Sequence, residues 1–167
     1  MEYFLAIPDK RIPNPLKFKA EERRFQSKEP QVINIGKAGN MVPSDLIINR
    51  FLFNSYFFLS NELQKLFKHY DESLDMVPLL ITNENYSMKL IYWRLNMEST
   101  ANVVTNKFLD AKNMLIDETL VKDKPIHKIH YEKQTFLLVN TYVVESVLRR
   151  YPVGIYFQEV NLAEGGS

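Results

Sequence analysis

The sequence predicts an α+β fold in which mainly antiparallel sheets are covered by two short amphipathic helices. Aromatic residues make up 13% of the 167 residues, and such side chains suit the half-buried surface of a strand. Two segments of similar residue type, Phe57–Leu63 and Leu137–Val143, each read as a buried strand that leads directly into a capped helix. Strand-to-helix units of this kind fit helices packed on a sheet.

Both helices are expected directly after a residue that caps them. The first is predicted at 61–70, after Ser60, whose hydroxyl can accept a hydrogen bond from a free amide of the first turn. The second is predicted at 141–149, after Asn140. In both segments apolar residues recur at helical spacing, so each helix has one face to bury.

Strands are predicted where apolar residues alternate with polar ones or where β-branched residues cluster. These runs lie at 3–7, 31–35, 76–82, 89–95, 114–121, 135–139 and 155–160. The runs at 76–82 and 89–95 are separated by Asn83-Glu84-Asn85, so they predict a hairpin.

Three segments allow more than one interpretation. The segment 43–53 fits a short helix capped by Ser44, and 126–129 fits either a short strand or the first turn of a helix. The weak pattern of 97–112 fits a strand around 103–104 or a loop.

The length suits one domain, which we expect at 1–162, because a chain of this size buries roughly two thirds of its unfolded surface. The small residues 163–167 are expected to form a flexible tail outside the fold. Prolines and basic residues interrupt the pattern at 10–28, and we interpret this stretch as a solvated connection rather than a functional basic patch.

Composition excludes several classes of protein. The net charge of +1 argues against a nucleic-acid partner, because neutralisation of phosphates supplies much of that affinity. The absence of cysteine excludes disulfides and thiolate metal sites. No apolar run reaches the length of a membrane span, and the N-terminus lacks the basic start of a signal peptide, so we expect a cytoplasmic protein.

No motif of catalysis or of cofactor binding is present. His127 and His130 point to opposite faces if they lie on a strand, and no acidic partner stands at metalloprotease spacing. No nucleophile elbow occurs, and the acidic pairs are adjacent in sequence. We therefore predict no catalytic, cofactor or metal residues and no enzyme, although a carboxylate pair drawn from distant positions stays open.

Aromatic and arginine residues on the second hairpin strand suggest a binding surface. The faces alternate along 91–95, so Tyr92 and Arg94 lie together opposite Trp93, and one face is expected to be exposed. Exposed Tyr, Trp and Arg are the residues that anchor protein interfaces. We predict Tyr86, Tyr92 and Arg94 as interface residues.

The segment from 125 to 160 carries a further pattern of four parts. It runs Pro125-Ile126-His127-Lys128-Ile129, Thr135-Phe136-Leu137-Leu138-Val139-Asn140, the helix to Leu148, and Gly154-Ile155-Tyr156-Phe157-Gln158-Glu159-Val160. This pattern resembles the C-terminal signature of a bacterial immunity-protein family of polymorphic toxin systems, formerly a domain of unknown function. The family typically has an aromatic where His127 stands, and Leu-Thr-Gly where this chain has Pro152-Val153-Gly154.

The resemblance implies an immunity (antitoxin) protein that binds and neutralises a cognate toxin in the cell that produces both. The signature contains no catalytic residue, and the family supplies no contact residues to carry over. The alternative is a structural or self-associating binding module, such as a homodimer. An enzyme built from dispersed residues and a nucleic-acid binder that uses the stretch at 10–28 are the remaining hypotheses.

Overall fold

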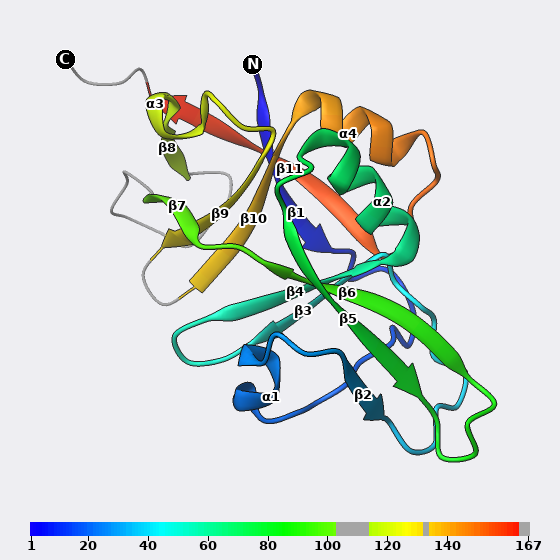
Figure 1. The fold of residues 1–167 in the computed structure, drawn as a ribbon. Helices are drawn as coiled ribbons and strands as arrows, with labels where there is room; N and C mark the ends of the chain where they lie inside the picture. Colours follow the sequence, from blue (N-terminus) through cyan, green and yellow to red (C-terminus); the bar gives the residue numbers. More distant parts are fainter. Residues whose placement is uncertain (103–113, 132–133, 164–167) are drawn as a thin grey trace.

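The computed structural model describes residues 1–102, 114–131 and 134–163, and its strands form two sheets (Figure 1). The six-stranded sheet has the order β7 (Ser99–Asn102), β9 (Ile126–Tyr131), β10 (Gln134–Asn140), β1 (Tyr3–Pro8), β11 (Ile155–Ala163) and β8 (Leu115–Asp117). The five-stranded sheet has the order β2 (Gln31–Asn34), β5 (Asp75–Thr82), β6 (Lys89–Asn96), β4 (Ser55–Ser60) and β3 (Leu46–Arg50). Among the strand pairs of the described residues, β2–β5, β7–β9 and β8–β11 are parallel and the others are antiparallel, which confirms the predicted α+β class with mainly antiparallel sheets.

Two of the helices begin at the predicted caps. Helix α2 (Asn61–Tyr70) starts where the Ser60 hydroxyl accepts a hydrogen bond from the Leu63 amide at 3.2 Å. Helix α4 (Thr141–Leu148) starts where the Asn140 side chain accepts one from the Val143 amide at 3.1 Å. Both predicted helices are confirmed, and α4 ends one residue earlier than expected.

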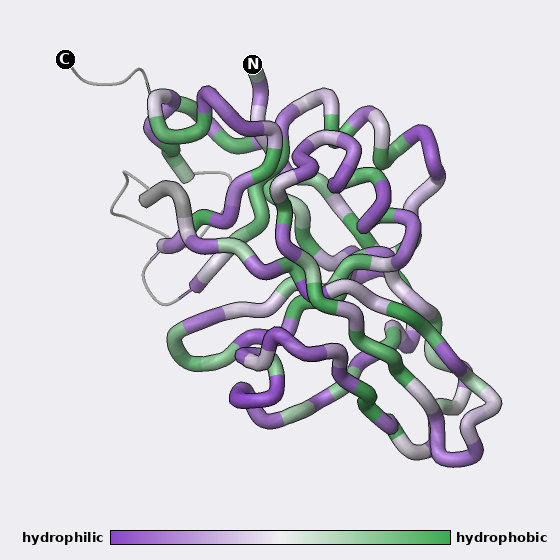
Figure 2. Tube along the Cα trace, viewed as in Figure 1, coloured by the Kyte–Doolittle hydropathy of each residue, from purple (hydrophilic) through white to green (hydrophobic). Residues whose placement is uncertain are grey.

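The two helices lie side by side and join the sheets into a shared core (Figure 1). Figure 2 shows hydrophilic and hydrophobic residues mixed along both helices, as their one-sided burial requires. Their buried faces pack against apolar residues of both sheets, including Phe57 and Leu59 of β4 and Leu137 and Val139 of β10. Each such side chain contributes about 1.5–3 kcal/mol when it is fully buried.

The two sheets are built alike. The order β3-β4-β6-β5-β2 in one sheet corresponds to β9-β10-β1-β11-β8 in the other, and every pair has the same relative direction. The helices α2 and α4 follow the corresponding strands β4 and β10. The N-terminal strand β1 thus occupies in the second sheet the place that β6 occupies in the first.

Hydrogen bonds at corresponding positions repeat as well. Ser60 lies opposite Tyr92, and Asn140 lies opposite Tyr3. The Ser60 amide donates to the Asp45 carbonyl at 2.8 Å, and the Asn140 amide donates to the Pro125 carbonyl at 2.9 Å. The Tyr92 hydroxyl donates to the carbonyl of Ser44, which precedes Asp45. The Tyr3 hydroxyl lies 3.3 Å from the carbonyl of Lys124, which precedes Pro125, and closer to the Val121 carbonyl, to which it donates. The similarity noted between 57–63 and 137–143 therefore reflects two copies of one structural unit.

Three segments differ from the prediction or settle an open choice. The segment 43–53 contains strand β3 rather than a helix, and the Ser44 side chain is buried beside the backbone of Gly154. Residues 126–129 lie in strand β9. The predicted strand 114–121 ends after Asp117, whose carboxylate accepts from the Thr119 amide and starts the short helix α3 (Glu118–Val121).

The stretch 10–28 covers one face of the five-stranded sheet. Leu16, Phe18 and Phe25, the last in helix α1 (Glu22–Gln26), are buried against that face, while most basic side chains of the stretch stay exposed. The stretch is therefore part of the fold and not only a solvated connection.

At the C-terminal end, Ala163 belongs to β11 instead of a tail, and 164–167 lie outside the described residues, as does the expected strand at 103–104. No helix in the described ranges combines the length and apolar character that crossing a bilayer requires.

Candidate functional site

The connection between α4 and β11 is the candidate functional site, and we call residues 149–154 the Tyr151 turn. The Arg150 amide donates to the Val147 carbonyl at 3.0 Å, and the Tyr151 amide donates to the Leu148 carbonyl at 3.1 Å. These bonds span three residues, so they tighten the end of the helix. Pro152 follows and cannot donate a hydrogen bond, so the helix stops there.

Backbone hydrogen bonds attach the Tyr151 turn to the rest of the protein. The Asp45 amide donates to the Val153 carbonyl at 2.7 Å, and the Val153 amide donates to the Asp45 carboxylate at 2.6 Å. The Asp9 amide donates to the Gly154 carbonyl at 3.0 Å. The turn of one structural unit is therefore held by the residues that precede β3 in the other unit and by the chain just after β1.

Gly154 makes this close approach to Ser44 possible. Its φ of +74° lies in the left-handed region, and a Cβ atom there would lie 2.6 Å from Ser44 Cβ and 3.2 Å from Ser44 Cα. A residue with a side chain would thus be strained and would also collide with its neighbour. Glycine is required for the turn to lie against Ser44.

Tyr151 is the most exposed large apolar or aromatic residue on the described surface, with 90% of its surface accessible. Its φ of +51° is unusual for a bulky residue, because the left-handed region brings Cβ close to the backbone and costs about 1–2 kcal/mol. Because the Tyr151 side chain is exposed, its burial provides almost no free energy to offset this strain. Such strain is often found at binding sites, where the surrounding structure holds the residue in place.

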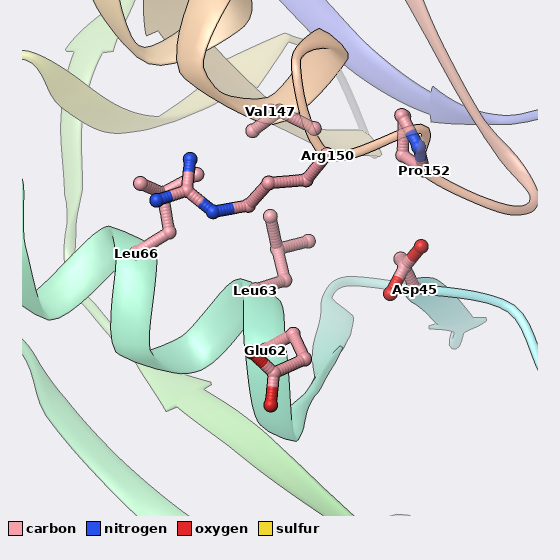
Figure 3. A pocket seen from close by; sticks show the side chains of 7 residues that line it. All are labelled: Asp45, Glu62, Leu63, Leu66, Val147, Arg150 and Pro152. Carbon is pink, nitrogen blue, oxygen red and sulfur yellow. The ribbon is translucent and has the colours of Figure 1, made fainter.

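A cavity of about 340 Å³ opens next to the Tyr151 turn, between α2 and the end of α4 (Figure 3). Leu63, Leu66 and Val147 form its apolar wall, and the Arg150 side chain extends across it from the end of α4. The Arg150 guanidinium donates to the Ser146 carbonyl at 2.6 Å, which orients it along the helix end. Glu62 and Asp45 stand at the other side of the cavity.

The side chains around Tyr151 are of the kinds that bind proteins. Leu148 and Val153 are exposed on either side of it in the sequence, and Arg149 and Arg150 precede it. Tyrosine and arginine contribute disproportionately to protein interfaces, particularly where they surround a pocket that a partner side chain can fill. We call Leu148 and the Tyr151 turn together the Tyr151 surface. Its arrangement suits binding and offers no pair of groups poised for proton transfer.

The interface residues predicted from the sequence are not brought together on one surface. Tyr92 and Arg94 are buried, with 2% and 4% of their surfaces exposed, because the stretch 16–27 covers that face of β6. The Tyr92 hydroxyl donates to the Ser44 carbonyl at 2.7 Å, and the Arg94 guanidinium donates to the Ser27 carbonyl at 2.6 Å. Burial raises the pKa of Tyr92 and lowers that of Arg94. The expectation that this face of the strand is available to a partner is wrong.

Tyr86 differs from the other two predicted residues. It lies in the loop between β5 and β6, is 61% exposed and has a φ of +55°. It thus shares with Tyr151 an exposed ring on a left-handed backbone. No described contact joins it to the Tyr151 turn, so it stays a separate candidate.

The histidine in the family-like segment has a structural role. His127 is buried, and its Nε2 lies 2.8 Å from the Lys124 carbonyl and 3.0 Å from the Val121 carbonyl, so it donates to this pair. Burial lowers the pKa of His127 and keeps the ring neutral. Its ring also contacts that of Tyr3. Across the residues with described positions, no three His, Asp or Glu side chains form a group suited to a metal ion.

Sequence reasoning missed the Tyr151 surface. The order Arg149-Arg150-Tyr151-Pro152 at a helix end was a usable signal, because an aromatic residue just before a proline there lies outside the buried helix face. Helices commonly end in the left-handed conformation that Tyr151 adopts, but glycine is the usual residue there, so a tyrosine gives no clear signal of it.

The fold and this site define a small α+β protein that presents an aromatic side chain on a firmly held turn. No family model matches the sequence, and a search of curated proteins finds no significant match.

Proposed function

We propose that this protein is an immunity protein that binds a cognate bacterial toxin through the Tyr151 surface and neutralises it in the cytoplasm of the producing cell. The observation that carries the proposal is Tyr151 itself, which is strained, almost fully exposed and held in place by its neighbours. A side chain with these properties stabilises the free protein little, so binding is its best explanation.

The resemblance to the immunity-protein family supports the same role. The segment that carries it forms β9, β10, α4 and β11, and therefore includes the Tyr151 turn. One departure from the signature is His127 in place of an aromatic residue. His127 fills a buried position next to the Tyr3 ring, where an aromatic side chain would also fit. A tight complex would bury about 800 Å² on this protein, which is more than the Tyr151 turn alone provides. The partner would thus also cover neighbouring surface.

The test is to use the protein as bait in cells that produce it and to identify the retained proteins by mass spectrometry. We expect one stoichiometric partner that carries a toxin domain, and we expect co-expression of this protein to suppress the lethality of that domain. Recovery of only the bait protein, from cells shown to make a toxin encoded next to it, would instead favour a self-associating module.

A further inference from the structure

A second hollow, which Gly154 of the Tyr151 turn also borders, lies between the stretch 8–19 and strand β3. It has a volume of about 450 Å³, and Gly154 and Ser44 form its end nearest the turn. Its apolar lining includes the partly exposed Ile12, Pro15 and Ile48 and the buried Leu16, Phe18 and Leu46. We call it the β3 groove.

The charged side chains that line the β3 groove give it a positive charge. Lys10, Lys17 and Lys19 are exposed along it, and within the described ranges none of them forms an ion pair with a carboxylate. Of the described residues that line the groove, Asp9 is the only acidic one. The Arg11 guanidinium binds the Asp9 carboxylate at 2.8 Å and lowers its pKa to about 2, so this negative charge is neutralised by Arg11. Three lysine charges therefore remain to act on a ligand.

The groove also follows an edge of the five-stranded sheet. β3 is the last strand of that sheet, and residues 46–49 line the groove. Beyond the ladder with β4, no described main-chain hydrogen bond involves residues 46–49. The outer edge of a terminal strand offers amide and carbonyl groups to an extended chain, which is a common way for proteins to bind peptides.

We infer that the β3 groove binds an acidic, extended segment of the protein partner, with its carboxylates on the three lysines and its apolar side chains on Ile12, Pro15 and Ile48. This inference rests on the proposed function, because the partner is the toxin held by the adjacent Tyr151 surface. The inference adds that the partner carries negative charge on the segment that faces the three lysines of the β3 groove.

A peptide fits the groove better than a nucleic acid. Proteins that bind single strands present aromatic faces on which bases stack. Phe18 is the only aromatic residue among the described residues of the groove lining, and it is buried. The net charge of +1 also provides little of the long-range attraction that nucleic-acid binding uses.

Fluorescence anisotropy with the purified full chain tests the inference. The probe is a labelled peptide of about eight residues, the length of a strand, in which Glu and Asp alternate with Leu. A peptide with Gln and Asn in place of the acids, and a short oligothymidylate, are the comparison ligands. We expect the acidic peptide to bind about tenfold or more tightly than either of them at low salt.

Charge reversal locates the site. Lys17→Glu with Lys19→Glu should weaken binding of the acidic peptide about tenfold or more. Lys28→Glu with Lys37→Glu makes the same change in charge on two exposed residues outside the groove, and it should leave binding within about twofold. Bound peptide should also slow hydrogen exchange at the amide of Ile48, which faces away from β4 in the alternating ladder. Equal effects of the groove and control variants, or equal binding of the oligothymidylate, would overturn the inference.

This assay contains no toxin, so its failure is distinct from failure of the proposed function. If the toxin is captured and neutralised but the peptide results are negative, the β3 groove assignment falls and the immunity role stands.

Discussion

Gly154 is the residue on which the position of the Tyr151 turn depends most. Gly154→Ala should lower the free energy of unfolding by about 2–4 kcal/mol, because it adds backbone strain and a collision with Ser44. Gly36→Ala is the matched control, since Gly36 has a similar φ of +71° and nothing within 4 Å of an added Cβ. The free energy of unfolding of Gly36→Ala should fall by only about 1–2 kcal/mol. Urea unfolding measures both, and equal losses would contradict the close packing at Gly154.

His127 should make stability depend on pH. Burial lowers its pKa in the folded protein, so below a pH of about 6.5 the unfolded chain binds a proton that the folded protein does not. Stability from this residue is therefore present above that pH and is lost as the pH falls towards the folded pKa. His127→Phe should flatten the change in the urea midpoint between about pH 7 and 5 relative to the parent. If the urea midpoint of His127→Phe changes with pH as much as that of the parent, His127 does not contribute to the pH dependence of stability.

Single residues also show which parts of the candidate site could be predicted from the sequence. The alternation of residue types along 91–95 predicted that Tyr92 and Arg94 lie on one face of a strand, and they do share a face. It could not reveal that Phe18 and Phe25, far away in the chain, cover that face. Tyr151 is the opposite case, because its exposure follows from the local order of helix end and proline. The hydrogen bonds that hold Val153 and Gly154 next to it come from distant residues, which the sequence could not reveal.

At the scale of elements, the two helix caps have equivalent positions but different connections. Asn140 caps α4, whereas Ser60 caps α2 and also donates to the Asp45 carboxylate at 2.6 Å. The second carboxylate oxygen of Asp45 accepts from the Val153 amide. The cap of α2 is therefore linked to the Tyr151 turn through one side chain.

Alanine substitutions separate these two roles. Asn140→Ala should cost about 1 kcal/mol, and Ser60→Ala should cost roughly 2 kcal/mol because a bond to a charged group is lost as well. Hydrogen exchange at the Val153 amide should accelerate in Ser60→Ala and stay unchanged in Asn140→Ala. If both variants leave that amide equally protected, Asp45 does not couple α2 to the turn.

Elements with local signals were predicted well. α2 and α4 each have a cap followed by one apolar face, and the β5–β6 hairpin has two clear runs and a turn. β3 lacked such a signal, because its run Leu46-Ile47-Ile48 after a serine also fits a helix start. Pairing with β4 decides the structure there, and that pairing is not visible in the segment itself.

At the scale of the whole molecule, the duplicated arrangement makes the N-terminal strand central. β1 lies between β10 and β11 and pairs with both, in the place that β6 occupies in the other sheet. Residues far apart in the chain therefore complete one structural unit, a relation that no local sequence pattern contains.

Removal of β1 should consequently disrupt the folded core and not only the N-terminal end of the chain. Deletion of residues 1–8 leaves the facing edges of β10 and β11 unpaired and takes Leu5 and Ala6 out of the core, so we expect cooperative urea unfolding to be lost. A synthetic peptide of residues 1–8 should restore it when added to the shortened chain. A shortened chain with the parental midpoint would show that the second sheet does not need β1.

The measurement that tests the central claim most directly compares affinity and stability in Tyr151→Gly, with the partner that the bait experiment identifies. Glycine relieves the left-handed strain, so stability should rise by about 1 kcal/mol. Affinity for the toxin should fall about thirtyfold or more, as expected when an interface anchor is lost. Tyr142→Ala, at an exposed tyrosine on α4 outside the turn, should leave affinity nearly unchanged. A Tyr151→Gly protein that binds the toxin as tightly as the parent would contradict the claim that the Tyr151 surface is the binding site.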